Sequence, residues 1–277
     1  MKKIDKEHKM TVDFILYPGV KVELEKRIKL LLKEADLSKK SSKEAIKAIL
    51  VPHAGWSHCD SIMASAYASV AHRDFERVVV LSKVHREPAK SIFLPEFLSY
   101  ISPLGNLEVD HTILSELSKS NSIFEYNNVP HVEEHSIEVQ IPFIKYLWPE
   151  AKIIPILTGK STGSISKKLS ESLSKVLGDK LGSTLFIISS SISSYETGDK
   201  SRKEADKFLS ILNNKEEWKS LPEMLNTGVI GACSADSLSA VLKLYENKTL
   251  ISILDLKYWE KLEEKEKRVC FGAISIN

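Results

Sequence analysis

The sequence predicts an α/β domain in which helices flank a central, mostly parallel β-sheet. Its short apolar runs are rich in β-branched residues, and several do not alternate with polar residues, which indicates strands buried on both faces. These runs are residues 45–51, 77–82, 151–157, 183–189, 249–256 and 270–276. Amphipathic stretches between them predict helices at residues 20–33, 61–70, 110–120, 136–147, 166–177, 201–212 and 235–245. Strands that alternate with helices in this way are typical of a layered fold with helices on both sides of the sheet.

The composition favours a single domain that spans residues 1–277. Hydrophobic residues make up 43% of the chain, which is ample for a substantial core, and no repeat or Pro/Gly linker divides it. The 39 Lys and Arg nearly balance the 37 Asp and Glu, for a formal net charge of +2. This balance gives no electrostatic basis for binding nucleic acid or an anionic membrane, so we expect a small-molecule or peptide ligand. The sequence leaves the oligomeric state open.

The sequence also favours a cytoplasmic location. The N-terminal apolar stretch FILY is too short for the hydrophobic region of a signal peptide, and no segment approaches the length of a membrane span. The three cysteines, Cys59, Cys233 and Cys270, are an odd number in a long chain. We therefore expect no disulfide framework, as is usual in a reducing compartment.

His53 follows the first of these predicted strands, in the stretch ILVPHAGWSHCD. In parallel sheets ligands gather beyond the carboxyl ends of the strands, which is where this histidine lies. Pro52 is expected to stiffen the strand exit and Gly55 to permit a sharp reversal, with a helix starting near Asp60 or Ser61. Considered alone, His53 has an ordinary alternative role, a hydrogen bond within the turn.

His85 lies three residues past Ser82, at the exit of the next predicted strand. Considered alone, it is an ordinary surface histidine in a loop. Parallel strands linked by a helix commonly become neighbours, however, so the exits of these two strands are expected to converge. We therefore expect His53 and His85 to share a site, whereas His58 and Cys59 belong to the turn and the start of the helix.

Cys233 precedes a predicted helix whose N-cap is Ser234 or Asp236. A thiol at a helix N-terminus feels the positive end of the helix dipole, which favours the thiolate, and the thiolate is the form that binds metal. The alternative is a small buried cysteine packed among glycine and alanine neighbours. Cys270, inside the last predicted strand, is expected to be a core residue.

The predicted strand at residues 183–189 runs out into a series of serines. Hydroxyl groups at a strand end can bind an anion or a substrate. None of these serines lies in the G-x-S-x-G turn of an α/β-hydrolase, so a serine nucleophile is not expected. The serines are Ser189, Ser190, Ser191, Ser193 and Ser194.

The sequence HVEEH, residues 131–135, matches the H-x-x-E-H pattern of one metallopeptidase group. That chemistry requires both histidines on one face of an established helix. Pro130 disfavours a helix immediately upstream, and the apolar spacing after Ser136 predicts that a helix only begins there, so both histidines are expected in its entry loop. A metallopeptidase is therefore a minor alternative. Glu134 and Glu138 are instead candidates to orient a neighbouring histidine.

Six segments carry a resemblance to a known family in their order and spacing: PHAGWSHCDSIMASAYASV, VVVLSKVH, SPLGNLEVD, EHSIEVQIPFIKYLWPEAKIIPIL, FIISSSISSY and GACSADSL. They resemble the Memo family, also called the AmmeMemoRadiSam system protein B family. The resemblance runs from about Tyr17 to the final CFGAISI. PHAG together with EHSIEVQIPF is a specific pair.

The resemblance implies a fold similar to the catalytic subunit of class III extradiol dioxygenases, non-haem iron enzymes that open catechol rings. It also implies that His53, His85 and Cys233 line the pocket in which those enzymes hold iron, with Glu134 and His135 beside it. Two imidazoles and a thiolate can bind Fe, Cu or Zn and leave an open coordination position.

The chain departs from the family pattern in two places. Family members typically read G-P-S-H at the second strand exit, where this chain has Ser82, Lys83, Val84 and His85 in sequence. They also typically carry an aspartate and a histidine among the serines of the later strand exit, where this chain has Ser191 and Ser194. In the dioxygenases a histidine in about that region serves as acid/base, and a serine hydroxyl does not titrate near neutrality. The resemblance thus implies that the metal ligands are kept and the acid/base group is lost.

Two function hypotheses follow. The leading one is a metal-dependent redox or dioxygenase-like activity, weakened or altered by that loss. Its metal ligands are His53, His85 and Cys233, and its pocket candidates are His135, Glu134, Ser191 and Ser194. The second is a non-catalytic protein that binds a peptide or a small molecule in the same pocket.

Overall fold

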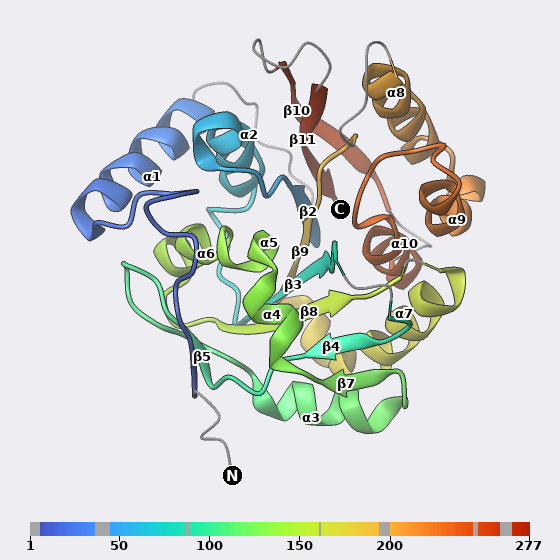
Figure 1. The fold of residues 1–277 in the computed structure, drawn as a ribbon, viewed down its shortest axis with the longest axis horizontal. Helices are drawn as coiled ribbons and strands as arrows, with labels where there is room; N and C mark the ends of the chain where they lie inside the picture. The colour runs from blue at the N-terminus through green and yellow to red at the C-terminus, as the bar shows by residue number, and fades with distance from the viewer. Residues whose placement is uncertain are drawn as a thin grey trace.

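A mixed β-sheet forms the centre of the molecule in the computed structural model, which describes residues 6–36, 45–86, 89–160, 162–193, 200–245, 249–260 and 268–277 (Figure 1). Within these residues the sheet has eight strands in the order β10–β11–β2–β9–β3–β8–β4–β7. Their bounds are β2 (Ala48–Val51), β3 (Arg77–Lys83), β4 (Ile92–Leu94), β7 (Phe124–Tyr126), β8 (Lys152–Thr158), β9 (Thr184–Ser189), β10 (Ile251–Glu260) and β11 (Arg268–Ile276).

The four middle strands, β2, β9, β3 and β8, are parallel to one another. The strands beside them, β11 and β4, run antiparallel to β2 and β8. The predicted α/β class with a parallel centre is therefore confirmed, and each predicted strand is present. The structure adds β4 and β7, which have three residues each and are too short to leave a clear pattern in the sequence.

Helices cover both faces of the sheet, as predicted (Figure 1). One face carries α1 (Lys21–Asp36), α2 (Trp56–Ala68), α5 (His135–Glu138) and α6 (Ile141–Leu147), and α2 packs on β2, β10 and β11. The other face carries α3 (His111–Ser120), α7 (Gly163–Leu177), α8 (Lys200–Leu212), α9 (Leu221–Asn226) and α10 (Ala235–Leu244), with the 3₁₀ helices η1 (Gly178–Ser183) and η2 (Lys215–Ser220). Within the described ranges, no helix has both the length and the apolar character needed to cross a membrane.

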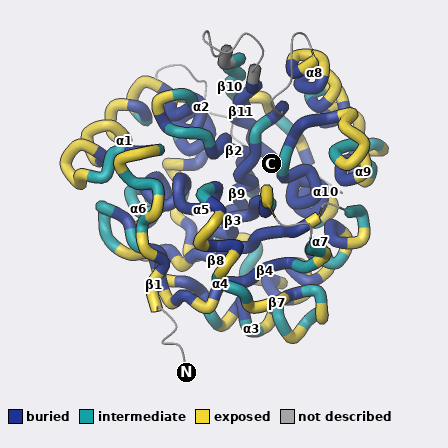
Figure 2. Tube along the Cα trace, viewed as in Figure 1, coloured by how far each residue is buried: buried dark blue, intermediate teal, exposed yellow. Residues whose placement is uncertain are grey.

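The burial pattern explains why the apolar runs form the sheet. Every residue of β2 and β9 is buried, and β3 and β8 are buried along their central residues. Figure 2 shows the strands as the buried centre, while α1 and α8 are exposed on their outer sides. A parallel strand covered by helices on both faces has no solvent side, so its sequence lacks the polar alternation of a half-exposed strand.

The helix after β2 begins earlier than predicted. α2 starts at Trp56 rather than near Asp60 or Ser61, and its N-cap is Gly55. The Trp56 amide donates a hydrogen bond to the Leu16 carbonyl over 2.7 Å, so the N-terminal segment satisfies the helix start without a capping side chain. Gly55 has φ −55°, an ordinary value for any residue, so the predicted need for a glycine at this reversal is wrong.

The predicted helix at residues 136–147 is divided into two. α5 ends at Glu138, and α6 begins at Ile141 with Pro142 in its first turn. Proline has no amide hydrogen and is tolerated only where that hydrogen would lack a helical partner. The chain therefore starts a new helix at this proline instead of continuing the previous one.

A second, smaller sheet lies beside α4 (Asn128–Glu133), and His131 connects the two through hydrogen bonds. Its strands are β1 (Glu7–His8), β5 (Ser99–Tyr100) and β6 (Leu107–Glu108). Tyr100 donates its hydroxyl hydrogen to His131 Nδ1 over 2.9 Å, and His131 Nε2 donates to the Phe93 carbonyl over 3.2 Å. His8 donates to the His131 carbonyl over 2.8 Å. His131 thus lies in a helix and not in an entry loop, because Pro130 falls in the first turn, where proline is tolerated.

We expect His131 to make the protein sensitive to acid. Burial lowers the pKa of its ring from 6.5 to about 3, and the hydrogen bond to Phe93 offsets only part of this effect. At pH 7 the ring is neutral in both the folded and the unfolded chain. Between about pH 6.5 and about pH 3 the unfolded chain takes up a proton that the folded chain does not, so the free energy of unfolding falls as the pH falls, by about 1.4 kcal/mol per pH unit.

Urea unfolding of the wild type and of His131→Gln, near pH 7 and near pH 5, measures this contribution. Glutamine can accept from Tyr100 and donate to Phe93, but it does not titrate. The wild type should lose roughly 2 kcal/mol more than the variant between the two pH values. Equal losses in the two proteins would show that His131 is not the source of acid sensitivity.

Candidate metal centre

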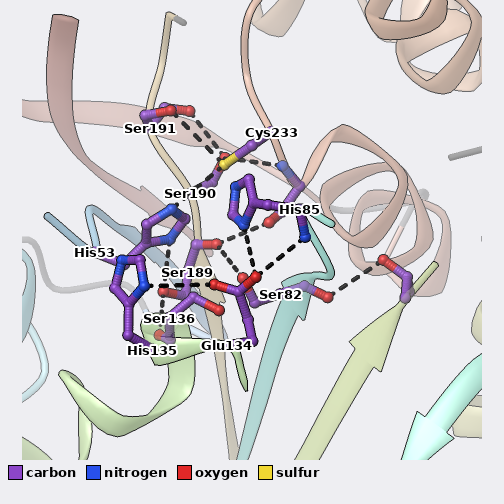
Figure 3. Close-up of polar contacts among 12 residues, drawn as sticks. His53, Ser82, His85, Glu134, His135, Ser136, Ser189, Ser190, Ser191 and Cys233 are labelled. Carbon is purple, nitrogen blue, oxygen red and sulfur yellow. Dashed lines mark hydrogen bonds and ion pairs between the residues drawn. The ribbon is translucent and has the colours of Figure 1, made fainter. Parts of the chain in front are cut away.

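Three polar side chains meet where two central strands end and α10 begins (Figure 3). His53 follows β2 and His85 follows β3, and both strands pair with β9, which lies between them and ends at Ser189. Cys233 directly precedes Ser234, the N-cap of α10. One ligand atom from each of His53, His85 and Cys233 lies within 4.8 Å of the other two. The strand exits therefore converge as predicted, although β2 and β3 are not direct neighbours.

Hydrogen bonds fix the tautomer of His53. Its Nδ1 lies 3.1 Å from Ser189 Oγ, and that hydroxyl donates its only hydrogen to the Ser136 carbonyl over 2.7 Å. The Gln140 amide also donates to Ser189 Oγ, over 3.1 Å. The hydroxyl must therefore accept a hydrogen bond from His53, which places a ring hydrogen on Nδ1 and leaves Nε2 as the ring nitrogen that faces the cluster. Nε2 lies 3.7 Å from Cys233 Sγ and is therefore the His53 ring atom available to the cluster.

Glu134 holds His85 in a similar way. The ring Nδ1 and the backbone amide of His85 both donate to Glu134 Oε2, over 2.8 Å and 3.1 Å, which leaves Nε2 as the ring atom available to the cluster. Burial alone would raise the pKa of Glu134, but the hydrogen bonds with His85 outweigh it and lower the pKa to about 2. The pKa of His85 is raised to about 10 by its contact with Cys233 and then by Glu134.

Cys233 occupies an environment that favours the thiolate. Its Sγ lies 3.7 Å from His53 Nε2, accepts from the Ser191 hydroxyl at 3.7 Å, and lies 3.4 Å from Ser190 Oγ. Burial would raise the pKa of the thiol, but the two neighbouring histidines hold it well below its usual value. The N-terminus of α10 acts in the same direction. These are the surroundings predicted for a reactive or ligating cysteine.

A cavity of about 280 Å³ adjoins the three ligand atoms. His135 lines it together with the cluster, and its ring meets that of His53 edge-on, with centroids 5.9 Å apart. Figure 3 shows Glu134 between His85 and His135, and its Oε1 lies 3.8 Å from His135 Nδ1. Val269 and Phe271 of β11 supply an apolar wall, and no lysine or arginine is among the described residues of the lining. The cavity thus offers histidine and cysteine donors beside an apolar surface, as small-molecule sites commonly do.

The remaining predicted residues divide between the cavity and the core. Ser191 lines the cavity, and Ser194 lies outside the described residues. Cys59 is buried in α2, where burial raises its pKa to about 12, and it does not reach the cavity. Cys270 is buried in β11, as predicted, and burial raises its pKa to about 11. His58 also lies in α2 and does not line the cavity.

The sequence prediction missed two residues that support the cluster. It did not include Gln140, and it did not give Ser189 a structural role. From the sequence, these serine hydroxyls are able to bind an anion or a substrate, whereas Ser189 is fully buried and its hydroxyl contacts His53 and the Ser136 carbonyl. Gln140 donates to Ser189 Oγ and to the Pro52 carbonyl, over 3.1 Å and 2.9 Å. Both residues are polar and lie beside or within apolar runs. A buried polar group needs hydrogen-bond partners, so a polar residue at such a position indicates a structural hydrogen bond.

His131 does not join the cluster. His131 lies in α4 and His135 begins α5, and Glu134 between them is extended, with φ −106° and ψ 117°. Both ring nitrogens of His131 are engaged by Tyr100 and Phe93. In the part of the chain that the structure describes, the only group with the spacing of metal ligands is His53, His85 and Cys233. The described residues therefore do not place both histidines on one helix, as H-x-x-E-H chemistry requires.

A solved structure shares the fold. The crystal structure of an uncharacterized protein from Escherichia coli K12 superimposes with a TM-score of 0.54, over 83% of this chain and 99% of that one. The two sequences are 12% identical over the match. At this identity the likeness shows the fold alone.

Sequence relatives identify the family. A MEMO1 family protein of Methanobrevibacter smithii is 29% identical over 183 residues, which cover 65% of this chain and 64% of that protein, just under two thirds of its length. One from Sulfurisphaera tokodaii is 28% identical over 202 residues, 70% of this chain and 69% of that protein. The memo-1 homolog of Caenorhabditis elegans is 32% identical over 146 residues, 52% of this chain and 41% of that protein. The sequence model of the Memo-like proteins matches residues 9–274, and the chain therefore belongs to the Memo-like protein family.

Proposed function

We propose that this protein binds a transition metal ion through His53, His85 and Cys233 and uses it for redox or dioxygenase-like chemistry on a small molecule in the adjoining cavity. One observation carries the proposal. The three ligand atoms lie within 4.8 Å of one another, and both imidazoles already use Nδ1 for a hydrogen bond to the protein. The ring atoms that remain available to an ion therefore lie close to the Cys233 sulfur.

The donor set fits such an ion. Two donors on one tetrahedral ion lie roughly 3.5 Å apart. His53 Nε2 and Cys233 Sγ are 3.7 Å apart, which is close to that separation. Hydrogen-bonded outer partners such as Glu134 and Ser189 commonly orient metal-bound histidines. Two imidazoles and a thiolate suit Fe, Cu and Zn, so these are the ions we propose.

Fe or Cu would supply one-electron redox chemistry at this site, and Zn would supply Lewis-acid chemistry. The chain's own residues determine the surroundings. Val269 and Phe271 line the cavity with apolar surface. Burial, and then the neighbouring His53 ring, lower the pKa of His135, so the His135 ring is neutral near pH 7 and can accept a proton. We propose that activity is weakened or altered relative to the dioxygenases, because this chain has Ser194 where family members typically carry a histidine, in about the region of the dioxygenases' acid/base group.

A second candidate function is non-catalytic binding of a small molecule or peptide in the same cavity. The observation that favours it is the apolar wall of Val269 and Phe271 beside His135, which offers a ligand contacts that need no metal. The two candidates differ in one measurable respect. A binding protein would keep its ligand affinity when metal is removed, whereas a metal-dependent protein would lose it.

Metal analysis tests the proposal directly. Anaerobically reconstituted wild-type protein should hold about one Fe, Cu or Zn ion per chain, and His53→Ala and Cys233→Ala should lose it, because each removes one of three ligands. His72→Ala, an exposed histidine outside the site, serves as the control and should keep the ion. Wild-type protein without stoichiometric metal would refute the metal-dependent function.

Glu134→Gln should weaken metal binding by about 10–100-fold, the usual effect of losing an outer partner of a metal-bound histidine. The variant removes the carboxylate charge beside His85 while keeping the side-chain shape. Competition with a chelator of known affinity measures the change. The exposed neighbour Glu133→Gln is a matched control for charge and location, and an equal effect of both variants would rule out a specific role for Glu134.

Metal binding should release about one proton per ion near neutral pH. Ligands bind metal only when deprotonated. His85 has a pKa of about 10 and carries a proton that the ion must displace, whereas the Cys233 thiol is already ionised because its pKa is well below its usual value. Affinity should therefore rise about tenfold per pH unit between about pH 6 and about pH 9.

Isothermal titration calorimetry in buffers of different ionisation enthalpy counts these protons. Release of about two protons would mean that a second ligand besides His85 carries a proton in the metal-free protein. Release of none would mean that His85 is neutral there. Either count would contradict the protonation state assigned to the cluster.

A further inference from the structure

Glu138, at the end of α5, is a buried carboxylate with 1% of its surface exposed. Its two oxygens accept hydrogen bonds from the Thr11 amide at 2.9 Å and 3.0 Å, from the Thr11 hydroxyl at 2.5 Å and from the Val12 amide at 3.0 Å. The Tyr17 hydroxyl donates to Oε1 over 3.0 Å. These donors all belong to residues 11–17, which we call the N-terminal strap.

The strap is folded so that both of its ends reach one carboxylate. Phe14 has φ 61°, and the chain reverses there through bonds from the Phe14 amide to the Tyr17 carbonyl and from the Leu16 amide to the Val12 carbonyl, both 2.8 Å long. A positive φ is unfavourable for a residue other than glycine. The Phe14 side chain is 72% exposed, so burial of its ring does not compensate this cost. The reversal itself brings Thr11, Val12 and Tyr17 together on Glu138.

The strap also contacts the segment that carries His53. The Leu16 carbonyl accepts from the Trp56 amide, three residues after His53, over 2.7 Å. The Trp56 ring in turn donates to the Val139 carbonyl, directly after Glu138, over 3.2 Å. The strap, the start of α2 and the end of α5 therefore form one bonded group.

α5 depends on such contacts because it has only four residues and no side-chain cap bond. An isolated single turn of helix is unstable. On the sheet side it is held by the bond from Ser189 to the Ser136 carbonyl. On the opposite side Glu138 holds it to the strap. A buried carboxylate without donors is strongly unfavourable, so undocking of the strap would destabilise this position of α5.

We propose that Glu138 is a positioning residue of the metal centre, through which the strap sets the place of Glu134 and His135 at the other end of α5. Glu134 in turn orients the His85 ring. This inference rests on the metal-binding function proposed above. It assigns a role in ligand geometry to a carboxylate that touches none of the ligands.

Full-length Glu138→Gln tests the proposal, because a glutamine amide group cannot accept the four strap donors as a carboxylate does. Affinity for the metal should fall by about tenfold, within the range seen when an outer partner of a metal site is lost. A second readout needs no metal: the ring N–H of His85 that donates to Glu134 should change its NMR signal in the metal-free protein. Glu133→Gln, an exposed neighbour, should change neither readout.

Tyr17→Phe is a milder variant, since it removes one donor to Glu138 and no group near the ligands. Its His85 signal and metal affinity should move in the same direction by smaller amounts. If Glu138→Gln does not fold, Tyr17→Phe carries the test. A folded variant with a lower Tm but an unchanged His85 signal would overturn the proposal, because Glu138 would then be merely structural.

The two proposals can fail separately. If the wild type binds no Fe, Cu or Zn, the metal-binding function fails, and the His85 signal still reports whether the strap positions Glu134. If the wild type binds metal and neither Glu138→Gln nor Tyr17→Phe changes affinity or signal, the positioning role alone is wrong.

Discussion

One buried residue, Ser189, contacts all three segments that carry the proposed ligands. Its hydroxyl accepts from the ring of His53. Its carbonyl accepts from the hydroxyls of Ser82, three residues before His85, and of Ser234, directly after Cys233, over 3.0 Å and 2.8 Å. Buried polar groups are costly when unpaired, so these bonds stabilise one arrangement of the three segments. The last residue of β9 therefore sets how far apart the ligands lie.

The parallel register explains why a β9 residue has this position. Val51 pairs with Ser189 on one side of β9, and Leu81 pairs with Ile188 on the other. The two strands that lead to His53 and His85 therefore both reach the end of β9 and finish at the same edge of the sheet. Cys233, 180 residues after His53, reaches that edge because α10 packs against β3 and β9. Distant parts of the chain thus meet at one edge of the sheet, as in other parallel α/β folds.

The sequence was sufficient for six of the eight described strands of the central sheet, for the fold class and for the convergence of His53, His85 and Cys233. These follow from apolar runs and from the way parallel strands end. The sequence was insufficient where a structural feature depends on a hydrogen-bond partner that is distant in the sequence. α2 starts at Trp56 because the Leu16 carbonyl receives its amide, and Ser189 is a structural contact because Gln140 and Ser136 lie against it. Neither contact leaves a local pattern, since each residue type is also common in turns and on surfaces.

The segment from Glu134 to Gln140 shows why such contacts matter for the site. Alternate residues reach different partners: Glu134 bonds to His85, the Ser136 carbonyl to Ser189, Glu138 to the N-terminal strap, and Gln140 to Ser189 and Pro52. Two of the four are buried carboxylates, and each depends on donors from another segment. The segment can satisfy both only when His85 and the strap are in place together. The geometry of the three candidate ligands, strap docking and the sheet edge are therefore coupled through the fold itself.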